Sequence, residues 1–149
     1  MCARALTSAK VLKRAARSVA REGLDPARVV IGHTDSWPRI EYWREIVTRG
    51  ATLEADFLGM NFTPLERAGE PKVIDLLKRL LDEGFEQQIM LSQDVCHDSQ
   101  LLSYGGNGYT YLQTTFLPRL LAAGVDQKTI DQITIKNPAR VLTLVKPSA

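Results

Sequence analysis

A unit of amphipathic helix, glycine and short strand occurs three times along this chain, and this alternation constrains the fold most. The expected helices cover residues 8–22, 38–49 and 70–83, and the expected strands cover 28–33, 52–58 and 88–93. A glycine stands just past each helix, where it adopts the left-handed conformation without steric cost. Strands that alternate with helices pair in parallel through right-handed crossovers. The sequence therefore predicts an α/β fold with a parallel sheet.

Two of these strands are apolar runs that end abruptly in a polar side chain. The run at 29–31 leads through Gly32 to His33, and the run at 89–91 is followed closely by Asp94. Apolar runs of this length are typical of buried parallel strands. Parallel α/β folds place their chemistry at the carboxyl ends of such strands. Because imidazole and carboxylate are common zinc ligands, His33 and Asp94 are candidate metal ligands.

Asp35 and Asp94 are also candidates for proton transfer. A carboxylate at the end of an apolar strand is costly to bury unless it is paired or bound to metal, so Asp94 is predicted to be a ligand or a general base. Asp35 could orient a ligand, accept a proton, or cap a helix that begins near Pro38. These roles of Asp35 stay open. We interpret His97 as an exposed loop residue and Cys96 as a small buried residue.

The middle strand alternates between apolar and polar side chains. Its apolar positions are odd-numbered, from Ala51 to Phe57, and its polar positions are Thr52, Glu54 and Asp56. In a barrel, the face with the two carboxylates would look into the top of the interior. On an edge strand, the same face would be solvated. The pattern leaves both interpretations open.

The chain changes character after Asp94. Residues 98–110 contain three glycines and predict a mobile loop beside the site. The run 105–108 is not a phosphate-binding loop, since it lacks the Lys-Ser/Thr ending. A helix over 110–123 is expected to kink at Pro118. The pair Asn137–Pro138 predicts the start of the last helix, with the asparagine as its cap.

Composition bounds the class of protein. The length of 149 residues suits one domain, 1–149, and the net charge of +2 is too small to favour nucleic acid as a partner. Basic residues near the start fit the outer face of a helix better than a transit peptide. No apolar stretch is long enough to span a membrane. The two cysteines form no paired motif, so we expect a cytoplasmic chain with free thiols.

Four motifs together give the chain a family resemblance. They are residues 23–35, 91–96, 104–109 and 137–140, in this order. With them the chain resembles the C-terminal half of the phosphotriesterase family, within the amidohydrolase superfamily. The resemblance implies a partial TIM (β/α)8 barrel, made of the last three strands, their helices and the C-terminal helices. Residues 1–149 would then be a single incomplete barrel domain.

The resemblance also implies a two-metal site that holds divalent ions, expected to be zinc. His33 would match the ligand at the end of strand six. Asp94 would match the strand-eight aspartate, which binds metal and takes a proton from the attacking hydroxide. Asp35 falls near the proton-relay aspartate, and Asp56 matches a strand-seven aspartate. Phe57 stands where relatives often have histidine or arginine, so a simple proton relay is in question.

The implied activity is hydrolysis of phosphotriester, lactone or related ester bonds in small molecules through a metal-bound hydroxide. A barrel of this type needs eight strands and about 250 residues, and a catalytic zinc takes three protein ligands. The ligands that the family takes from its first five strands, including a His-x-His pair, have no counterpart here. We therefore expect this chain alone to be inactive. The alternative is a half-barrel without catalysis that associates with an N-terminal half or forms a homo-oligomer, or an α/β interaction module whose motifs are relics.

Overall fold

Three short strands form a parallel sheet at the centre of the described part of the chain. The structure, a computed structural model, describes residues 25–60 and 69–143. The strands are β1 (Val30–Ile31), β2 (Thr52–Ala55) and β3 (Ile89–Leu91), and they lie side by side in chain order. The predicted α/β class is confirmed. Each strand is shorter than the segment that the sequence predicts, and β2 covers only the first four residues of its segment.

β2 lies between the other two strands. Its Leu53 pairs with Ile31 of β1 on one side and with Ile89 of β3 on the other. The polar face of this strand is not solvated, because Thr52 is 1% exposed and Asp56 is 6% exposed. The edge-strand interpretation is therefore wrong for this segment. The Asp56 carboxylate is buried and that of Glu54 is partly buried, which agrees with the barrel interpretation.

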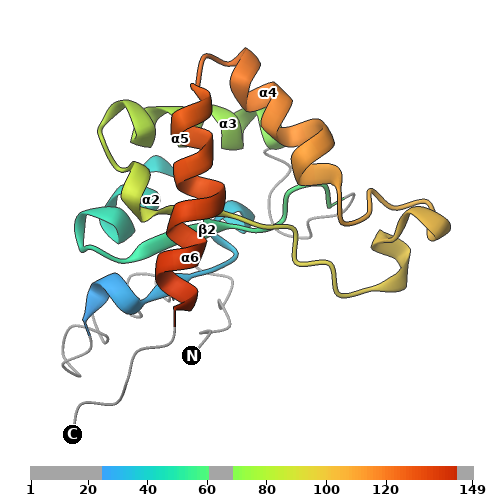
Figure 1. The fold of residues 1–149 in the computed structure, drawn as a ribbon, viewed down its shortest axis with the longest axis horizontal. Helices are drawn as coiled ribbons and strands as arrows, with labels where there is room; N and C mark the ends of the chain where they lie inside the picture. The colour runs from blue at the N-terminus through green and yellow to red at the C-terminus, as the bar shows by residue number, and fades with distance from the viewer. Residues whose placement is uncertain (1–24, 61–68, 144–149) are drawn as a thin grey trace, which may run out of the picture.

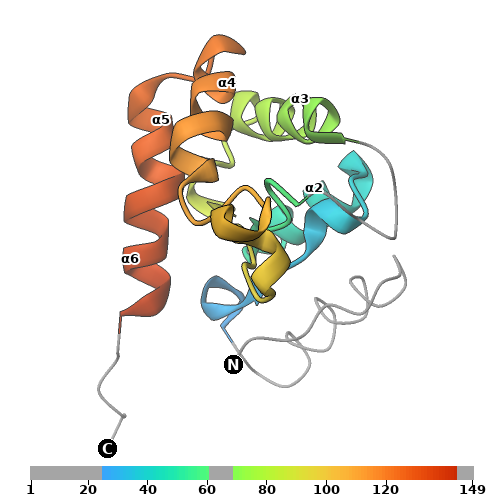
Figure 2. The same cartoon turned by 90° about the vertical axis from the view of Figure 1, so that its right-hand side faces the viewer.

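Helices surround the sheet in an arc. They are α2 (Ile40–Thr48), α3 (Gly69–Asp82), α4 (Leu117–Ala122), α5 (Gln127–Asp131) and α6 (Asn137–Leu142). Figure 2 shows α2 on one side of the arc, α3 above the sheet, and α5 and α6 on the other side. Figure 1 shows α5 and α6 stacked end to end in front of the sheet. This layering is the one that strand–helix alternation predicts.

The core forms where the helices meet the sheet. The apolar stripe predicted for α3 is buried at Val73, Leu76, Leu77 and Leu80, and it packs with the apolar residues of β2 and β3. The glycines just past α2 and α3 have the expected left-handed conformation, with φ of 81° at Gly50 and 85° at Gly84. The expected helix at 8–22 and its glycine lie outside the described residues.

The helix predicted over 110–123 is a π-helical turn followed by an α-helix. The π-helical turn covers Leu112–Phe116 and leads directly into α4, which has Pro118 in its first turn. Proline has no N–H to donate to the preceding turn. The helix accommodates the expected disruption at Pro118 by widening just before it.

Asn137 is not a helix cap, and this prediction is wrong. The helix continues from α5 through a π-helical turn, Gln132–Lys136, into α6. The buried Asn137 side chain instead donates hydrogen bonds to the carbonyl oxygens of Glu86, at 2.6 Å, and Ile89, at 2.7 Å. Its Oδ1 accepts a bond from Gln132 at 2.7 Å. The amide therefore joins α6 to the beginning of β3, a role that local sequence does not reveal.

Substitution of Asn137 by alanine is expected to lower the free energy of unfolding by about 3 kcal/mol. Two buried carbonyl groups would lose their donor, and each unsatisfied group costs about 1–3 kcal/mol. Urea unfolding of the full chain measures this loss. Gln113→Ala, at an exposed position on the Leu112–Phe116 turn, is the control and should change stability little. Equal effects of the two substitutions would contradict the role of Asn137.

Candidate active site

His33 and Asp94, the two candidate metal ligands, share an unusual backbone conformation. Among the described residues they are the only non-glycine residues with positive φ, 57° at His33 and 42° at Asp94. This conformation costs about 1 kcal/mol or more outside glycine, and it tends to occur at functional sites. Both residues follow carboxyl ends of parallel strands, which meet at one edge of the sheet. The backbone thus singles out the same two residues that the sequence does.

The His33 ring is held on two sides. Asp56 Oδ1 accepts a hydrogen bond from the His33 backbone N–H at 2.9 Å and lies 3.0 Å from its Nδ1. Phe57 stacks on the ring, with centroids 4.7 Å apart. A carboxylate on one ring nitrogen is the usual partner of a metal-bound histidine. Because Asp56 occupies Nδ1, Nε2 is the nitrogen that could bind a metal.

Asp35 connects the ends of β1 and β2. Its carboxylate accepts hydrogen bonds from the backbone N–H groups of Asp56, at 3.3 Å, and Phe57, at 2.8 Å. The residue before α2 is Arg39, and no side chain caps this helix. The interpretation of Asp35 as a helix cap is therefore wrong, because partners more than twenty residues away occupy its carboxylate. A role in proton transfer stays a prediction.

Acidic groups at this edge of the sheet resist ionisation. Burial, with a contribution from the charge of Asp56, raises the pKa of Asp35 to about 7 against the opposing backbone hydrogen bonds. Burial raises the pKa of Asp56 to about 6, although its hydrogen bond to His33 acts in the opposite direction. Burial also raises the pKa of Glu54, whose charge interacts with His33, Asp35 and Asp94. A bound cation would relieve this crowding of carboxylates.

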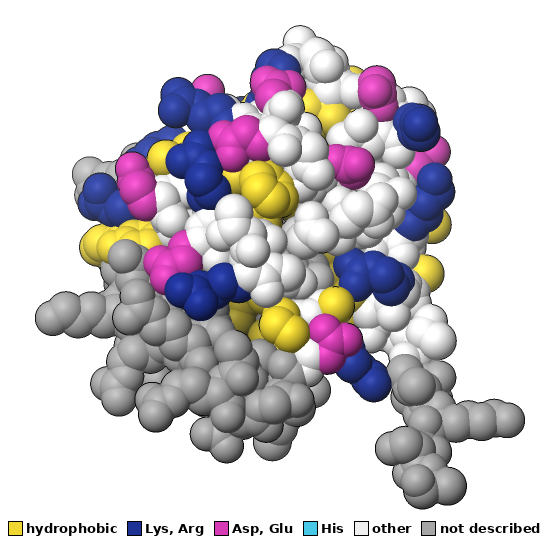
Figure 3. Space-filling model, turned by 90° about the vertical axis from the view of Figure 1, so that its left-hand side faces the viewer, with side chains coloured by type: hydrophobic (Ala, Val, Ile, Leu, Met, Phe, Trp, Pro, Cys, Tyr) yellow, Lys and Arg dark blue, Asp and Glu magenta, His cyan; other side chains and the backbone are white. Residues whose placement is uncertain are grey.

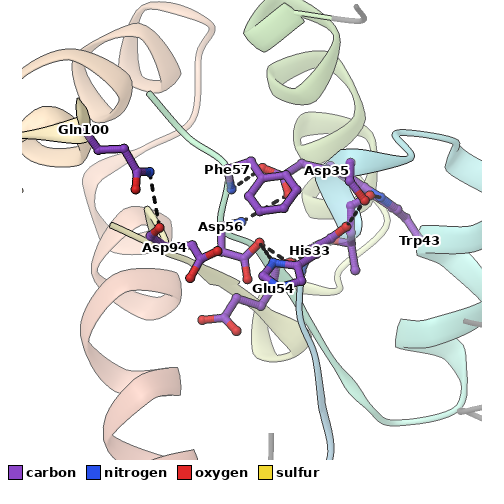
Figure 4. A network of polar contacts seen from close by, with 10 residues as sticks. His33, Asp35, Trp43, Glu54, Asp56, Phe57, Asp94 and Gln100 are labelled. Atoms are coloured by element: carbon purple, nitrogen blue, oxygen red, sulfur yellow. Dashed lines mark hydrogen bonds and ion pairs between the residues drawn. The ribbon is translucent and has the colours of Figure 1, made fainter. Parts of the chain in front are cut away.

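Figure 4 shows the resulting arrangement. Glu54 and Asp56 extend from β2 toward the space between His33 and Asp94. Two further acids thus lie near His33 and Asp94: Glu54, which the sequence places only on one face of a strand, and Asp56, which the family resemblance matches to a strand-seven aspartate. The signal that could have identified Glu54 and Asp56 is their alternation in a strand that proves to be central.

The residues after Asp94 turn outward. His97 is exposed, as expected, but Cys96 is exposed too, and its interpretation as a buried residue is wrong. The backbone N–H of Cys96 donates to the Gln100 side chain at 2.8 Å, which keeps the cysteine on the surface of the turn. In the described part of the chain, these two residues take no part in the arrangement around His33.

The donors fit a metal ion in kind but not in number. His33 Nε2 and the Asp94 carboxylate are suitable ligands for zinc. Within residues 25–60 and 69–143, however, no three His, Cys, Asp or Glu side chains are grouped so that they could hold an ion. A catalytic zinc takes three protein ligands and keeps one position open. The described residues therefore offer two candidate donors and not a complete donor set.

Charges on the outer surface are mixed. Figure 3 shows lysine and arginine side chains interspersed with aspartate and glutamate on one face of the molecule. Arg44 on α2, for example, forms a two-pronged ion pair with Glu83 just past α3, at 2.6 and 2.8 Å. In the described residues, none of the helices has the length and apolar character needed to cross a membrane. The expected cytoplasmic location stays a prediction.

The tautomer of the neutral His33 ring should differ from that of His97, the other histidine of the chain. Above pH 6 an ionised Asp56 accepts a hydrogen bond, so neutral His33 is expected to have its proton on Nδ1. Long-range ¹H–¹⁵N NMR at pH 8 distinguishes the two tautomers, with exposed His97 as the internal reference. Asp56→Ala should abolish the difference. A wild-type His33 with its proton on Nε2 would contradict the assignment.

Comparison with known proteins places this geometry in context. The sequence model of the phosphotriesterase family matches residues 6–142. An N-acetyltaurine hydrolase of Dictyostelium discoideum is 33% identical over 131 residues, which are 83% of this chain and 35% of the relative. The phosphotriesterase homology protein of Escherichia coli is 35% identical over 119 residues, 79% of this chain and 39% of the relative. The chain thus spans little more than a third of these relatives.

Solved structures show the same fold. A resiniferatoxin-binding protein from Rhodobacter sphaeroides superposes with a TM-score of 0.82 and 33% identity, over 87% of this chain and 38% of that protein. An organophosphorus hydrolase from Deinococcus radiodurans superposes with a TM-score of 0.76 and 25% identity, over 89% of this chain and 42% of that protein. The matched proteins are (β/α)8 barrels, so the predicted partial barrel is confirmed.

Proposed function

The chain belongs to the phosphotriesterase family, and we propose that it supplies one part of the active site of a metal-dependent hydrolase. His33 and Asp94 are the metal ligands of this part, and the metal is a divalent ion, with zinc preferred. The substrates are small molecules with a phosphotriester, lactone or related ester bond. The matched relatives add a further candidate bond, the amide of N-acetyltaurine.

The observation that supports this proposal most strongly is the shared conformation of His33 and Asp94. Both residues have a left-handed backbone at the carboxyl ends of parallel strands. Asp56 occupies Nδ1 of His33 and leaves Nε2 for a ligand. A purely structural role for these residues would not require a strained backbone at both strand ends.

Each acidic residue has a distinct role in the proposal. Asp94 binds the ion through its carboxylate and accepts the proton released in the reaction. Asp56 orients the His33 ring, and Asp35 fixes the backbone of Asp56 and Phe57, next to that ring. A divalent ion, when bound, polarises the bond to be cleaved and lowers the pKa of a water molecule. Asp35 is the candidate for passing the proton on, since its pKa of about 7 allows both protonation states near neutral pH.

The other ligands come from outside the described residues, either from the remaining strands of a barrel or from another chain. Two donors do not hold a catalytic zinc, and the chain covers 35–39% of the length of the matched relatives named above. We therefore propose that the chain works only within a larger assembly. The isolated 149-residue chain is expected to be inactive.

The isolated chain is expected to show no metal-dependent hydrolysis above background. The purified protein is assayed with added zinc, manganese or cobalt against a phosphotriester, a lactone and N-acetyltaurine. Asp94→Ala is the control, because it removes one proposed ligand. Hydrolysis that needs metal and disappears in Asp94→Ala would overturn the proposed inactivity while supporting the role of Asp94.

A second candidate function is association without catalysis. The observation in its favour is the small number of metal donors in the described residues. Such a half-barrel would bind an N-terminal half or a second copy of itself to cover its sheet. Size-exclusion chromatography with light scattering distinguishes the two states. A stable, folded monomer would count against association with a second copy. The proposal that the chain is part of a hydrolase would then be favoured over the second candidate function.

A further inference from the structure

The turn after Asp94 is closed by a single side chain. The Oε1 of Gln100 accepts hydrogen bonds from the backbone N–H groups of Cys96 and His97, both at 2.8 Å. Its Nε2 donates to the backbone carbonyl of Asp94 at 3.3 Å, the contact drawn in Figure 4. Both ends of one amide therefore bind the backbone that follows Asp94.

The glycine loop fixes Gln100 in turn. The backbone N–H of Gly108 donates to the carbonyl of Gln100 at 2.8 Å. A Cβ at Gly106 would lie 2.2–2.5 Å from the Gln100 backbone, so only glycine fits there. On the other side of Asp94, the Gln93 side chain donates to the carbonyl of Gly108 at 2.8 Å. The sequence assigns no chemistry to the run 105–108. In the structure this run contacts Gln93, which precedes Asp94, and Gln100, which follows it.

Something must impose the left-handed conformation of Asp94, because φ of 42° is unfavourable for a residue with a Cβ. Aspartate tolerates this region better than most residues with a Cβ, but it does not prefer it. Within the described residues, its hydrogen bond to Gln100 uses the backbone carbonyl and leaves the carboxylate free of that contact. The hydrogen bonds of the surrounding turn are therefore the candidate source of the constraint.

We propose that Gln100 is a positioning residue for Asp94. Its side chain, seated on the glycine loop, holds Asp94 in the left-handed conformation and so determines where the carboxylate points. The use of that carboxylate as a ligand rests on the proposed function. The conformational role of Gln100 does not, and it can be tested without substrate or metal.

Four proteins test the coupling: the wild type, Asp94→Gly, Gln100→Ala and the double variant. Glycine adopts positive φ without cost, so Asp94→Gly should raise the thermal midpoint as long as residue 94 is held in that conformation. Without Gln100 the aspartate relaxes, and the same substitution should give no rise. An equal rise in both backgrounds would overturn the proposal, since Gln100 would then not be the constraint.

NMR of the full chain gives a second, direct measurement. The three-bond HN–Hα coupling and the ¹³C shifts of Asp94 report its φ. We expect a left-handed signature in the wild type and in the control Gln113→Ala, and its loss in Gln100→Ala. If Gln100→Ala fails to fold, Gln100→Met replaces it, because methionine keeps the length of the side chain and loses both its acceptor for Cys96 and His97 and its donor to Asp94. A left-handed Asp94 in Gln100→Met would then refute the proposal.

The two proposals fail in different ways. If the coupling is found but Asp94→Ala has no effect on hydrolysis by a complete barrel, the ligand role fails and the positioning role stands. If Asp94 proves essential but its conformation is independent of Gln100, the positioning role fails and the ligand role stands.

Discussion

Asp94→Ala is expected to lower hydrolysis by about a thousandfold or more in a complete barrel that contains this chain. The barrel can be built by placing the chain in the matched segment of the Dictyostelium N-acetyltaurine hydrolase, with which it aligns over 131 residues. The loss is large because one carboxylate is proposed both to bind the ion and to accept the proton. Turnover of N-acetyltaurine and the zinc content of the purified chimera are measured together.

Three further variants make this experiment specific. His33→Ala should reduce both turnover and zinc content, because it removes the other proposed ligand. His97→Ala is the matched control at an exposed histidine and should change neither. Asp94→Gly should lose activity as Asp94→Ala does, while it gains stability from its positive φ. Full activity in Asp94→Ala or His33→Ala would contradict the assignment of that residue.

Much of the fold could be predicted because its signals are local. The period of the apolar residues in α3 and the glycine past its end depend on neighbours within a few turns. The prediction at Asn137 failed for the opposite reason. Asparagine before proline fits a helix start, but a π-helical turn carries the helix through that point, and the Asn137 side chain satisfies carbonyl groups about fifty residues away.

In the candidate site, too, local features could be predicted and contacts between distant residues could not. His33 and Asp94 could be predicted because each lies within three residues of the end of an apolar strand. The partners of His33 and Asp35 could not, because Asp56 and Phe57 reach them only through the pairing of β1 with β2. The strained backbone at His33 and Asp94 is likewise a property of the folded chain. The Gln100 side chain bonds backbone only three to six residues before it, but the left-handed Asp94 in that turn and the glycine loop packed on Gln100 appear only in the folded chain.

The stability of the chain is expected to fall as the pH rises from about 4 to about 7. The pKa of Asp35 is about 7 in the folded chain, against 3.8 for an aspartate without these surroundings. Between these values the folded state keeps a proton that the unfolded state has released, so raising the pH favours unfolding. One pKa unit corresponds to about 1.4 kcal/mol, so Asp35 contributes a fall on the order of 4 kcal/mol. Asp56 adds to the fall below about pH 6.

Asp35→Asn isolates this contribution. The amide does not titrate, so the free energy of unfolding should fall less between pH 4 and 7 than it does in the wild type. The difference should be most of the contribution expected from Asp35, and it does not depend on the other carboxylates. Urea unfolding at several pH values, with a chelator present to exclude divalent ions, gives the slope of unfolding free energy against pH for the wild type and for Asp35→Asn. Asp98→Asn, at an exposed position, should keep the wild-type slope. Equal slopes in Asp35→Asn and the wild type would show that Asp35 is ionised in the folded chain. The backbone N–H groups of Asp56 and Phe57, and not burial, would then control its charge.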